Sequence, residues 1–227
     1  MRPFRTLILR GVICSMLCCA ATAHSGVSLA QTSGQPAAAS LAAPAQVQID
    51  LLRGLADIFS RGMDTLTDQL NRQGYSARVY STSGWQTVAR RTADRYFRGH
   101  KEVIVIIGHS LGANATFDVA NYLNQHNIPV DLVVTFDATD PRPVPKNVLH
   151  LVNFYQQNGF GKKVVPGPDF KGELSNVDLT ADMGLSHTTI EKSPRLHAMV
   201  MRKIADIVNA DLAKRVKASK PMSKKRK

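Results

Sequence analysis

Residues 102–108 (EVIVIIG) form an apolar run that consists largely of β-branched side chains. A strand with one face in water alternates apolar and polar residues, whereas this run has no polar side chain after Glu102. Such a pattern is typical of a strand buried on both faces, which occurs in parallel sheets covered by helices. The run therefore predicts an α/β protein, and 227 residues are enough for one such domain.

Signals for strands and helices alternate along the rest of the chain. Strands are expected at 47–53, 76–81, 102–108, 128–136 and 147–156, and helices at 60–74, 85–99, 111–125 and from Pro194 onward. This alternation implies right-handed crossovers and a three-layer, doubly wound, mostly parallel sheet. The Gly- and Pro-rich stretch 158–172 is expected to be a long loop, with a short hairpin as an alternative.

A serine lies between two glycines directly after the buried strand, in Gly108-His109-Ser110-Leu111-Gly112. A G-x-S-x-G pattern in a strand-to-helix turn is typical of a nucleophile elbow. The turn is so sharp that side chains two residues before and after the serine would collide with the neighbouring strand and helix, and glycine removes that clash. Ser110 is therefore the candidate nucleophile, and the N–H of Leu111 is a candidate oxyanion donor.

A serine hydroxyl needs a base to take its proton, and His187 is the best placed of the seven histidines. It lies in a loop between the last expected strand and the last helix, where an imidazole can reach the serine. His197, on the last helix, is the alternative base. His109 occupies the variable position of the elbow and is expected to point away from the serine.

Asp137 directly follows the strand 128–136, so its carboxylate is expected at the same edge of the sheet as Ser110. A carboxylate there can accept the imidazole N–H and hold the required tautomer. The alternative acids are Asp140, Asp178 and Asp182.

A second oxyanion donor is expected from the loop after the first strand. The strand 47–53 ends in Arg53-Gly54-Leu55, and Gly54 allows the backbone to turn close to a substrate. The backbone N–H of Leu55 is the candidate, with the segment 60–63 (SRGM) as the alternative.

Three segments resemble the α/β-hydrolase superfamily, in particular its compact bacterial serine esterases, lipases and thioesterase-like proteins. They are GHSLGA (108–113), VVTFD (133–137) and GLSHTTI (184–190), and the resemblance covers residues 47–213. It implies an α/β-hydrolase fold with little or no lid. It also implies hydrolysis of a carboxylic ester, lipid ester or thioester through a Ser110–His187–Asp137 triad and an acyl-enzyme, with no cofactor and no metal.

The chain departs from the pattern of the superfamily in two respects. Most members carry the acid after the next strand, here 147–156, whereas some use the strand end at which Asp137 lies. The usual His-Gly dipeptide of the oxyanion loop is Arg53-Gly54 here. The small size of the chain leaves little room for a lid, which favours an open-site hydrolase over an interfacially activated lipase.

The first 30 residues have the features of a signal peptide. Three arginines precede a short apolar stretch that contains all three cysteines, and small-residue cleavage sites lie at 21–23 and 28–30. The alternative is an uncleaved membrane anchor. Residues 31–46, rich in Ala, Ser and Pro, are expected to form a flexible linker. The protein is thus expected to be exported, to the periplasm or out of the cell.

The formal net charge of +12 is concentrated at the two ends of the chain. The leader has three Arg and the tail 214–227 has eight Lys or Arg, both without acidic residues, so 18 basic and 17 acidic side chains lie between them. The tail is expected to be disordered. A more specific hypothesis is that the tail contacts an anionic envelope surface. An export signal argues against a specific nucleic-acid partner, so the expected partner is a small-molecule or lipid ester substrate.

Two other functions remain open from the sequence. A hydrolase-fold protein held on an anionic surface by its tail would bind a ligand without catalysis. An acyltransferase would pass the acyl group from Ser110 to an acceptor other than water. A metal site is not indicated, because the histidines are scattered and no H-E-x-x-H motif or paired-cysteine spacing occurs.

Overall fold

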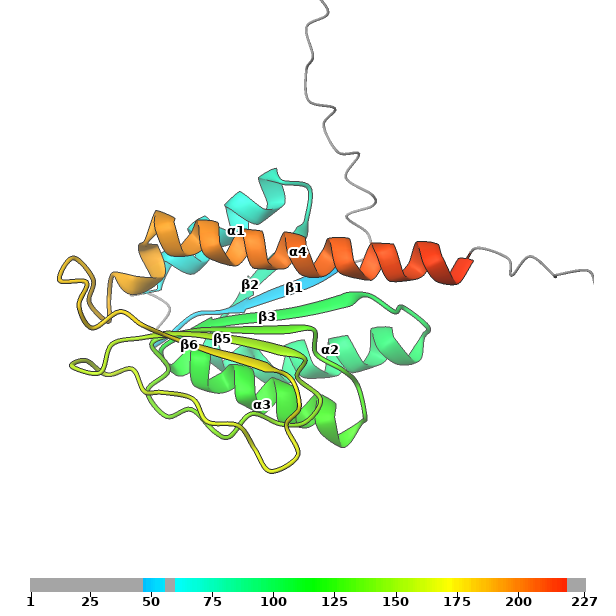
Figure 1. The fold of residues 1–227 in the computed structure, drawn as a ribbon, viewed down its shortest axis with the longest axis horizontal. Helices are drawn as coiled ribbons and strands as arrows, with labels where there is room; N and C mark the ends of the chain where they lie inside the picture. Colours follow the sequence, from blue (N-terminus) through cyan, green and yellow to red (C-terminus); the bar gives the residue numbers. More distant parts are fainter. Residues whose placement is uncertain (1–46, 56–59, 220–227) are drawn as a thin grey trace, which may run out of the picture. The chain divides into compact units, whose positions relative to one another are not determined.

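The computed structural model describes residues 47–55 and 60–219. They form a six-stranded, wholly parallel sheet in the order β2-β1-β3-β4-β5-β6 (Figure 1). The strands are β1 (Val47–Leu52), β2 (Ser76–Tyr80), β3 (Val103–His109), β4 (Leu132–Phe136), β5 (His150–Tyr155) and β6 (Glu173–Asp178). The helices are α1 (Arg61–Arg72), α2 (Trp85–Phe97), α3 (Leu111–Gln125) and α4 (Pro194–Ser219), with 3₁₀ turns η2 (Thr82–Gly84) and η3 (Ile190–Lys192).

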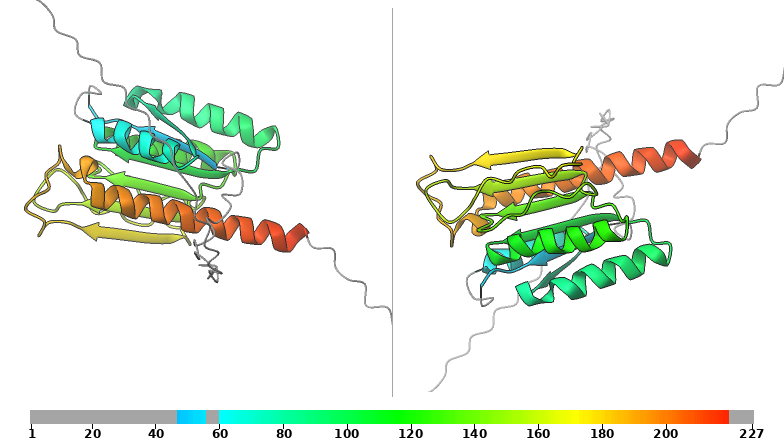
Figure 2. Two further views of the ribbon diagram at one scale, coloured as in Figure 1. Left: turned by 90° about the horizontal axis from the view of Figure 1, so that it is seen from above. Right: turned by 90° about the horizontal axis from the view of Figure 1, so that it is seen from below.

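Helices cover both faces of the sheet. α1 and α4 lie on one face, and α2 and α3 lie on the other (Figure 2). Along β3, Val103, Val105 and Ile107 pack toward α1 and α4, whereas Ile104 and Ile106 pack toward α2 and α3. Both faces of β3 are therefore buried, and the expected three-layer α/β architecture is confirmed.

The pairing register brings the carboxyl ends of the inner strands to one edge of the sheet. Leu52 of β1 pairs with Gly108 of β3, His109 pairs with Phe136 of β4, and Phe136 pairs with Phe154 of β5. The loops that follow these strands therefore converge. In open parallel sheets, ligands bind at this edge.

The edge strand β6 lies outside the strands that the sequence predicts. Four of the six residues in its sequence, ELSNVD, are polar, and none of the six is buried. An edge strand has one neighbour only and keeps a partly solvated face, so it lacks the apolar run that marks an inner strand. The expected loop 158–172 precedes β6 and contains no strand or helix.

α4 is longer than the sequence predicts. The expected disordered tail begins at Lys214, whereas the helix continues to Ser219. Ala, Lys and Arg favour helix, and Arg215 forms an ion pair with Asp211 one turn earlier.

The expected signal peptide, the linker and the rest of the tail lie outside the described residues. Among the helices that the structure describes, none has the length and hydrophobicity needed to cross a membrane.

Candidate active site

The elbow after β3 has the backbone that its two glycines predict. Ser110 has φ 56° and ψ −122°, a conformation that side chains rarely adopt. A Cβ on Gly108 would overlap the backbone of Gly112, and a Cβ on Gly112 would overlap the carbonyl oxygens of Leu52 and Arg53. The backbone segments around the turn therefore lie so close together that both positions require glycine. The turn places the serine at the start of α3.

The structure brings Ser110, His187 and Asp137 into one hydrogen-bonded chain. The Nε2 atom of His187 lies 2.9 Å from Oγ of Ser110, and its Nδ1 atom lies 2.7 Å from Oδ2 of Asp137. Because a carboxylate only accepts, Nδ1 carries the ring proton and Nε2 accepts from the serine hydroxyl. In this arrangement the imidazole can take the proton of Ser110 as the hydroxyl attacks a carbonyl carbon.

The loop after β5 closes over the carboxylate of Asp137. The side chain of Asp137 is fully buried, and its Oδ1 atom accepts the backbone N–H of Gln156 at 3.2 Å. Gly161 lies so close that a Cβ there would overlap the carboxylate. The carboxylate is thus held from one side by this loop and from the other by His187.

The alternative base and acids do not join this chain. His197 on α4 is buried, and its Nε2 atom donates to the carbonyl oxygen of Glu191 at 2.7 Å. Asp178 and Asp182 bond their neighbours in the surface turns after β6, and Asp140 is exposed. None of these four side chains has a hydrogen bond to His187 in the described part of the chain.

The expectation that His109 points away from the serine is wrong. Its ring is buried, and its Nδ1 atom lies 2.7 Å from Oγ of Ser60, which accepts the backbone N–H of Gly54 at 2.7 Å. Its Nε2 atom lies 2.8 Å from the carbonyl oxygen of His187. The carbonyl only accepts, so Nε2 carries the proton and the Ser60 hydroxyl donates to Nδ1. Burial lowers the pKa of His109 to about 4, so the ring stays neutral near pH 7.

His109 therefore connects three active-site segments, namely the loop after β1, the elbow and the loop of His187. The alternation of side chains along β3 predicts the direction in which His109 points. Val103, Val105 and Ile107 point toward α1 and α4, and His109, two residues after Ile107, points to the same face. That face carries Ser60 just before α1 and His187 shortly before α4.

A pocket with a volume of about 310 Å³ lies over the nucleophile. Its lining residues are Leu55, Ser60, His109, Ser110, Leu111, Thr139, Phe160, His187 and Thr188. Phe160 and Leu55 are 68% and 62% exposed, and the ring centroid of Phe160 lies 5.0 Å from that of His187. Exposed apolar side chains at the mouth of a pocket are suited to an apolar substrate group.

Both backbone donors expected for an oxyanion lie at this pocket. Leu111 is the first residue of α3, where a backbone N–H has no partner within the helix. Leu55 lines the pocket from the loop after β1. Trp85, at the start of α2, packs against the core between the sheet and α2 and α3 and does not line this pocket.

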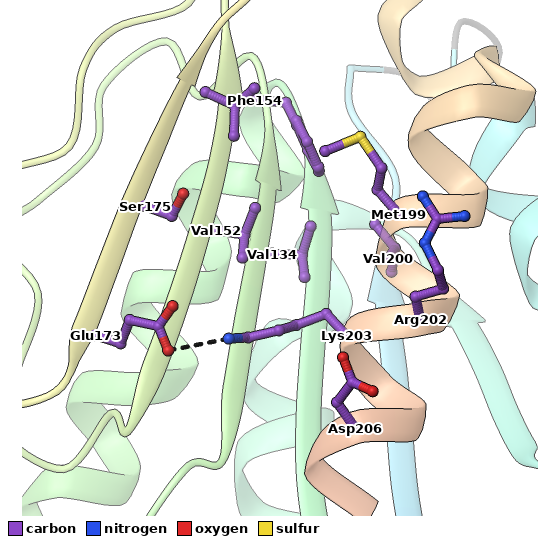
Figure 3. Close-up of a pocket in the computed structure, with 11 residues that line it drawn as sticks. Val134, Val152, Phe154, Glu173, Ser175, Met199, Val200, Arg202, Lys203 and Asp206 are labelled. Carbon is purple, nitrogen blue, oxygen red and sulfur yellow. Dashed lines mark hydrogen bonds and ion pairs between the residues drawn. The ribbon is translucent and has the colours of Figure 1, made fainter.

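A second cavity of similar size, about 320 Å³, lies on the sheet face between α4 and the strands β4, β5 and β6 (Figure 3). Its walls are apolar near Phe154 and Met199, and an ion pair of 3.0 Å between Lys203 and Glu173 crosses the other end. It contains no histidine beside its one serine, Ser175, so the elements of a nucleophilic site are absent from its lining.

Across residues 47–55 and 60–219, no group of three or more His, Cys, Asp or Glu is placed to hold a metal ion.

The parallel sheet, the elbow after β3 and the order of serine, aspartate and histidine along the chain define an α/β-hydrolase-like protein. Human thioesterase 2 has a similar crystal structure, with a TM-score of 0.51 and 13% identity over 73% of this chain and 97% of that one. A proposed hydrolase of the alpha/beta superfamily from Xanthomonas campestris pv. campestris matches with a TM-score of 0.42 and 16% identity, over 69% of this chain and 99% of that one. No family model matches the sequence, and no curated protein does. The parallel sheet and the likeness to human thioesterase 2, which concerns the fold, confirm the expected α/β-hydrolase fold.

Proposed function

We propose that the protein is a serine hydrolase that cleaves carboxylic esters through an acyl-enzyme on Ser110. The observation that carries this proposal is the hydrogen-bonded chain from Ser110 Oγ through His187 to the buried carboxylate of Asp137, at 2.9 and 2.7 Å. A protein that only binds a ligand has no need of a nucleophile, a base and an orienting acid in this order.

In the proposed reaction, the oxygen of Ser110 attacks the ester carbonyl while His187 takes its proton. The negative oxygen of the tetrahedral intermediate accepts from the N–H groups of Leu111 and Leu55. His187 then gives its proton to the departing alcohol, and the acyl group stays on the serine. Water, activated by the same imidazole, hydrolyses the acyl-enzyme and restores the free hydroxyl.

The substrate that we propose has a compact apolar acyl group. Leu55, Leu111 and Phe160 give the pocket an apolar mouth, and its volume of 310 Å³ is at the small end of ligand pockets. The likeness to human thioesterase 2 keeps a thioester as the alternative substrate, with a thiol in place of the alcohol as the leaving group. We favour oxygen esters because the amino-terminal signal pattern indicates export, and exported proteins meet few coenzyme A thioesters.

Labelling with a fluorophosphonate probe tests the nucleophile directly. Wild-type protein is expected to be labelled and to cleave nitrophenyl esters, whereas Ser110→Ala is expected to do neither. Turnover across esters of increasing acyl length then measures the size of the pocket. A wild-type protein that stays unlabelled and cleaves no short ester would overturn the proposal in favour of a non-catalytic binding protein.

A further inference from the structure

Basic side chains gather on the part of the molecule that is remote from the candidate active site. α2 and α4 run back from the carboxyl ends of the strands, so both helices end at the edge where the strands begin (Figure 1). The exposed basic residues on α2, on the turn after it and on the last turns of α4 are Arg90, Arg98, Lys101, Lys214 and Lys217, which we call the basic surface.

The α2 part of the basic surface contains a shallow hollow of about 460 Å³. Four arginines line it, together with Thr87 and Asp94: Arg90, Arg91, Arg95 and Arg98. Two of them are engaged inward, since Arg91 pairs with Asp50 and Arg95 pairs with Glu102. Arg90 and Arg98 have no ion-pair partner within 4 Å among the described residues. Their guanidinium groups are therefore free to bind an anion from solution.

The basic surface extends from α2 to the end of α4, past the amino ends of the strands. The guanidinium group of Arg215 donates to the backbone carbonyl of Lys101, which joins the last turns of α4 to the turn after α2. Lys214 and Lys217 are exposed on these last turns. The basic segment 220–227 follows directly in the sequence and adds five Lys or Arg.

Two large apolar side chains are exposed among these charges. Phe97, at the end of α2, is 65% exposed, and Val216, near the end of α4, is 56% exposed. Lys and Arg that surround exposed aromatic and aliphatic side chains are typical of a surface that settles into the headgroup region of a bilayer. An anion-binding site for a soluble ligand would not need the apolar members.

We propose that the basic surface docks the protein on a membrane rich in anionic phospholipid, with Arg90 and Arg98 on headgroup phosphates and Phe97 and Val216 at the level of the headgroups. The attraction is electrostatic, so it weakens as salt rises. This docking does not depend on the proposed hydrolase activity. It leaves the edge of the sheet that carries Ser110 directed away from the membrane.

Sedimentation of the purified full chain with vesicles tests the docking. Binding is expected with vesicles that contain phosphatidylglycerol and not with pure phosphatidylcholine. The double variant Arg90→Glu/Arg98→Glu is expected to bind about tenfold more weakly or worse, since each cationic side chain at the surface contributes about 1 kcal/mol. The matched control is Lys162→Glu/Lys163→Glu, which makes the same charge change on exposed residues of the loop 158–172 and is expected to bind as wild type does.

Three outcomes would overturn the proposal. The first is equal loss of binding in the two double variants, because net charge alone would then explain it. The second is loss of all binding when Lys224, Lys225, Arg226 and Lys227 are changed to Gln, with full binding in the Arg90→Glu/Arg98→Glu variant. The third is binding to an oligonucleotide without binding to vesicles. A melting temperature of Arg90→Glu/Arg98→Glu equal to that of the wild type shows that the variant has folded.

Discussion

At the scale of single residues, the carboxylate of Asp137 determines which nitrogen of His187 can act as a base. The Asp137→Asn variant keeps the shape of the side chain but can donate to Nδ1, which favours the tautomer that cannot accept from Ser110. We expect kcat on a soluble nitrophenyl ester to fall about a thousandfold or more. Asp178→Asn, the matched control, is expected to keep the wild-type rate. A nearly normal rate for Asp137→Asn would show that Asp137 is not the acid of the triad, and it would leave the assignment of Ser110 as nucleophile unchanged.

His109 has a positioning role, because it touches the backbone of His187 and not the reacting atoms. His109→Phe keeps a ring in the buried site but leaves the carbonyl oxygen of His187 without its donor. We expect kcat to fall by about tenfold to a hundredfold, which corresponds to the 1–3 kcal/mol of a lost buried hydrogen bond. KM is expected to change little.

A conservative variant separates positioning by His109 from simple loss of packing. The amide of His109→Gln can donate to the same carbonyl oxygen, so part of the lost kcat is expected to return. The melting temperatures of His109→Phe and His109→Gln serve as the folding control. If both variants lose kcat in proportion to their loss of stability, His109 has a structural role alone.

At the scale of elements, the segment from His187 to α4 packs against α1 with a buried acid, Glu191, at the contact. The Glu191 carboxyl lies beside Gly62 in the first turn of α1, has no hydrogen-bond partner among the described residues, and has Lys192 Nζ at 3.7 Å. Burial raises its pKa to about 7. The folded protein therefore binds a proton that the unfolded chain releases near pH 4.5, and ionisation above that value destabilises the fold.

Glu191→Gln is expected to stabilise the protein at alkaline pH and not at acidic pH. The unfavourable contribution of Glu191 grows between about pH 4.5 and 7 and is constant above, so the variant should gain about 3 kcal/mol at pH 8. Urea denaturation at pH 4.5 and pH 8 measures the difference. Glu173→Gln is the control with the opposite sign, because Lys203 lowers the pKa of Glu173. A gain for Glu191→Gln that is equal at both pH values would reject burial of the charge as its cause.

The inner elements, Ser110 and Asp137 could be predicted from local patterns in the sequence, and His187 from its place in a loop between the last expected strand and the last helix. β3 is apolar without interruption, Ser110 has a glycine two residues to each side, and Asp137 ends a buried strand. β6 leaves no such pattern, since an edge strand satisfies its polar residues with water. The contacts of Ser60 with His109 and of Phe160 with His187 were not predicted, because they arise from loops that meet only when the sheet has formed.

At the scale of the whole molecule, the two proposed surfaces lie at opposite edges of one sheet. The serine follows the carboxyl end of β3, and Lys101 lies just before its amino end. Seven residues of strand span about 20 Å, so the nucleophile lies about that far from the basic end of the sheet. A protein docked through Lys101 and its neighbours would thus hold its pocket toward the solution.

This separation predicts how a docked enzyme treats different substrates. When vesicles containing phosphatidylglycerol bind all of the protein, kcat/KM for a soluble short-chain ester should stay within about twofold of its value in free solution, because no contact with the triad changes. The same preparation should cleave an ester lipid within the bound vesicle slowly, because that bond lies on the far side of the protein. Turnover of both substrates, measured with the bound fraction determined by sedimentation, provides the test. A soluble-ester rate that falls in step with the bound fraction would instead place the edge with Ser110, Leu55 and Phe160 against the membrane.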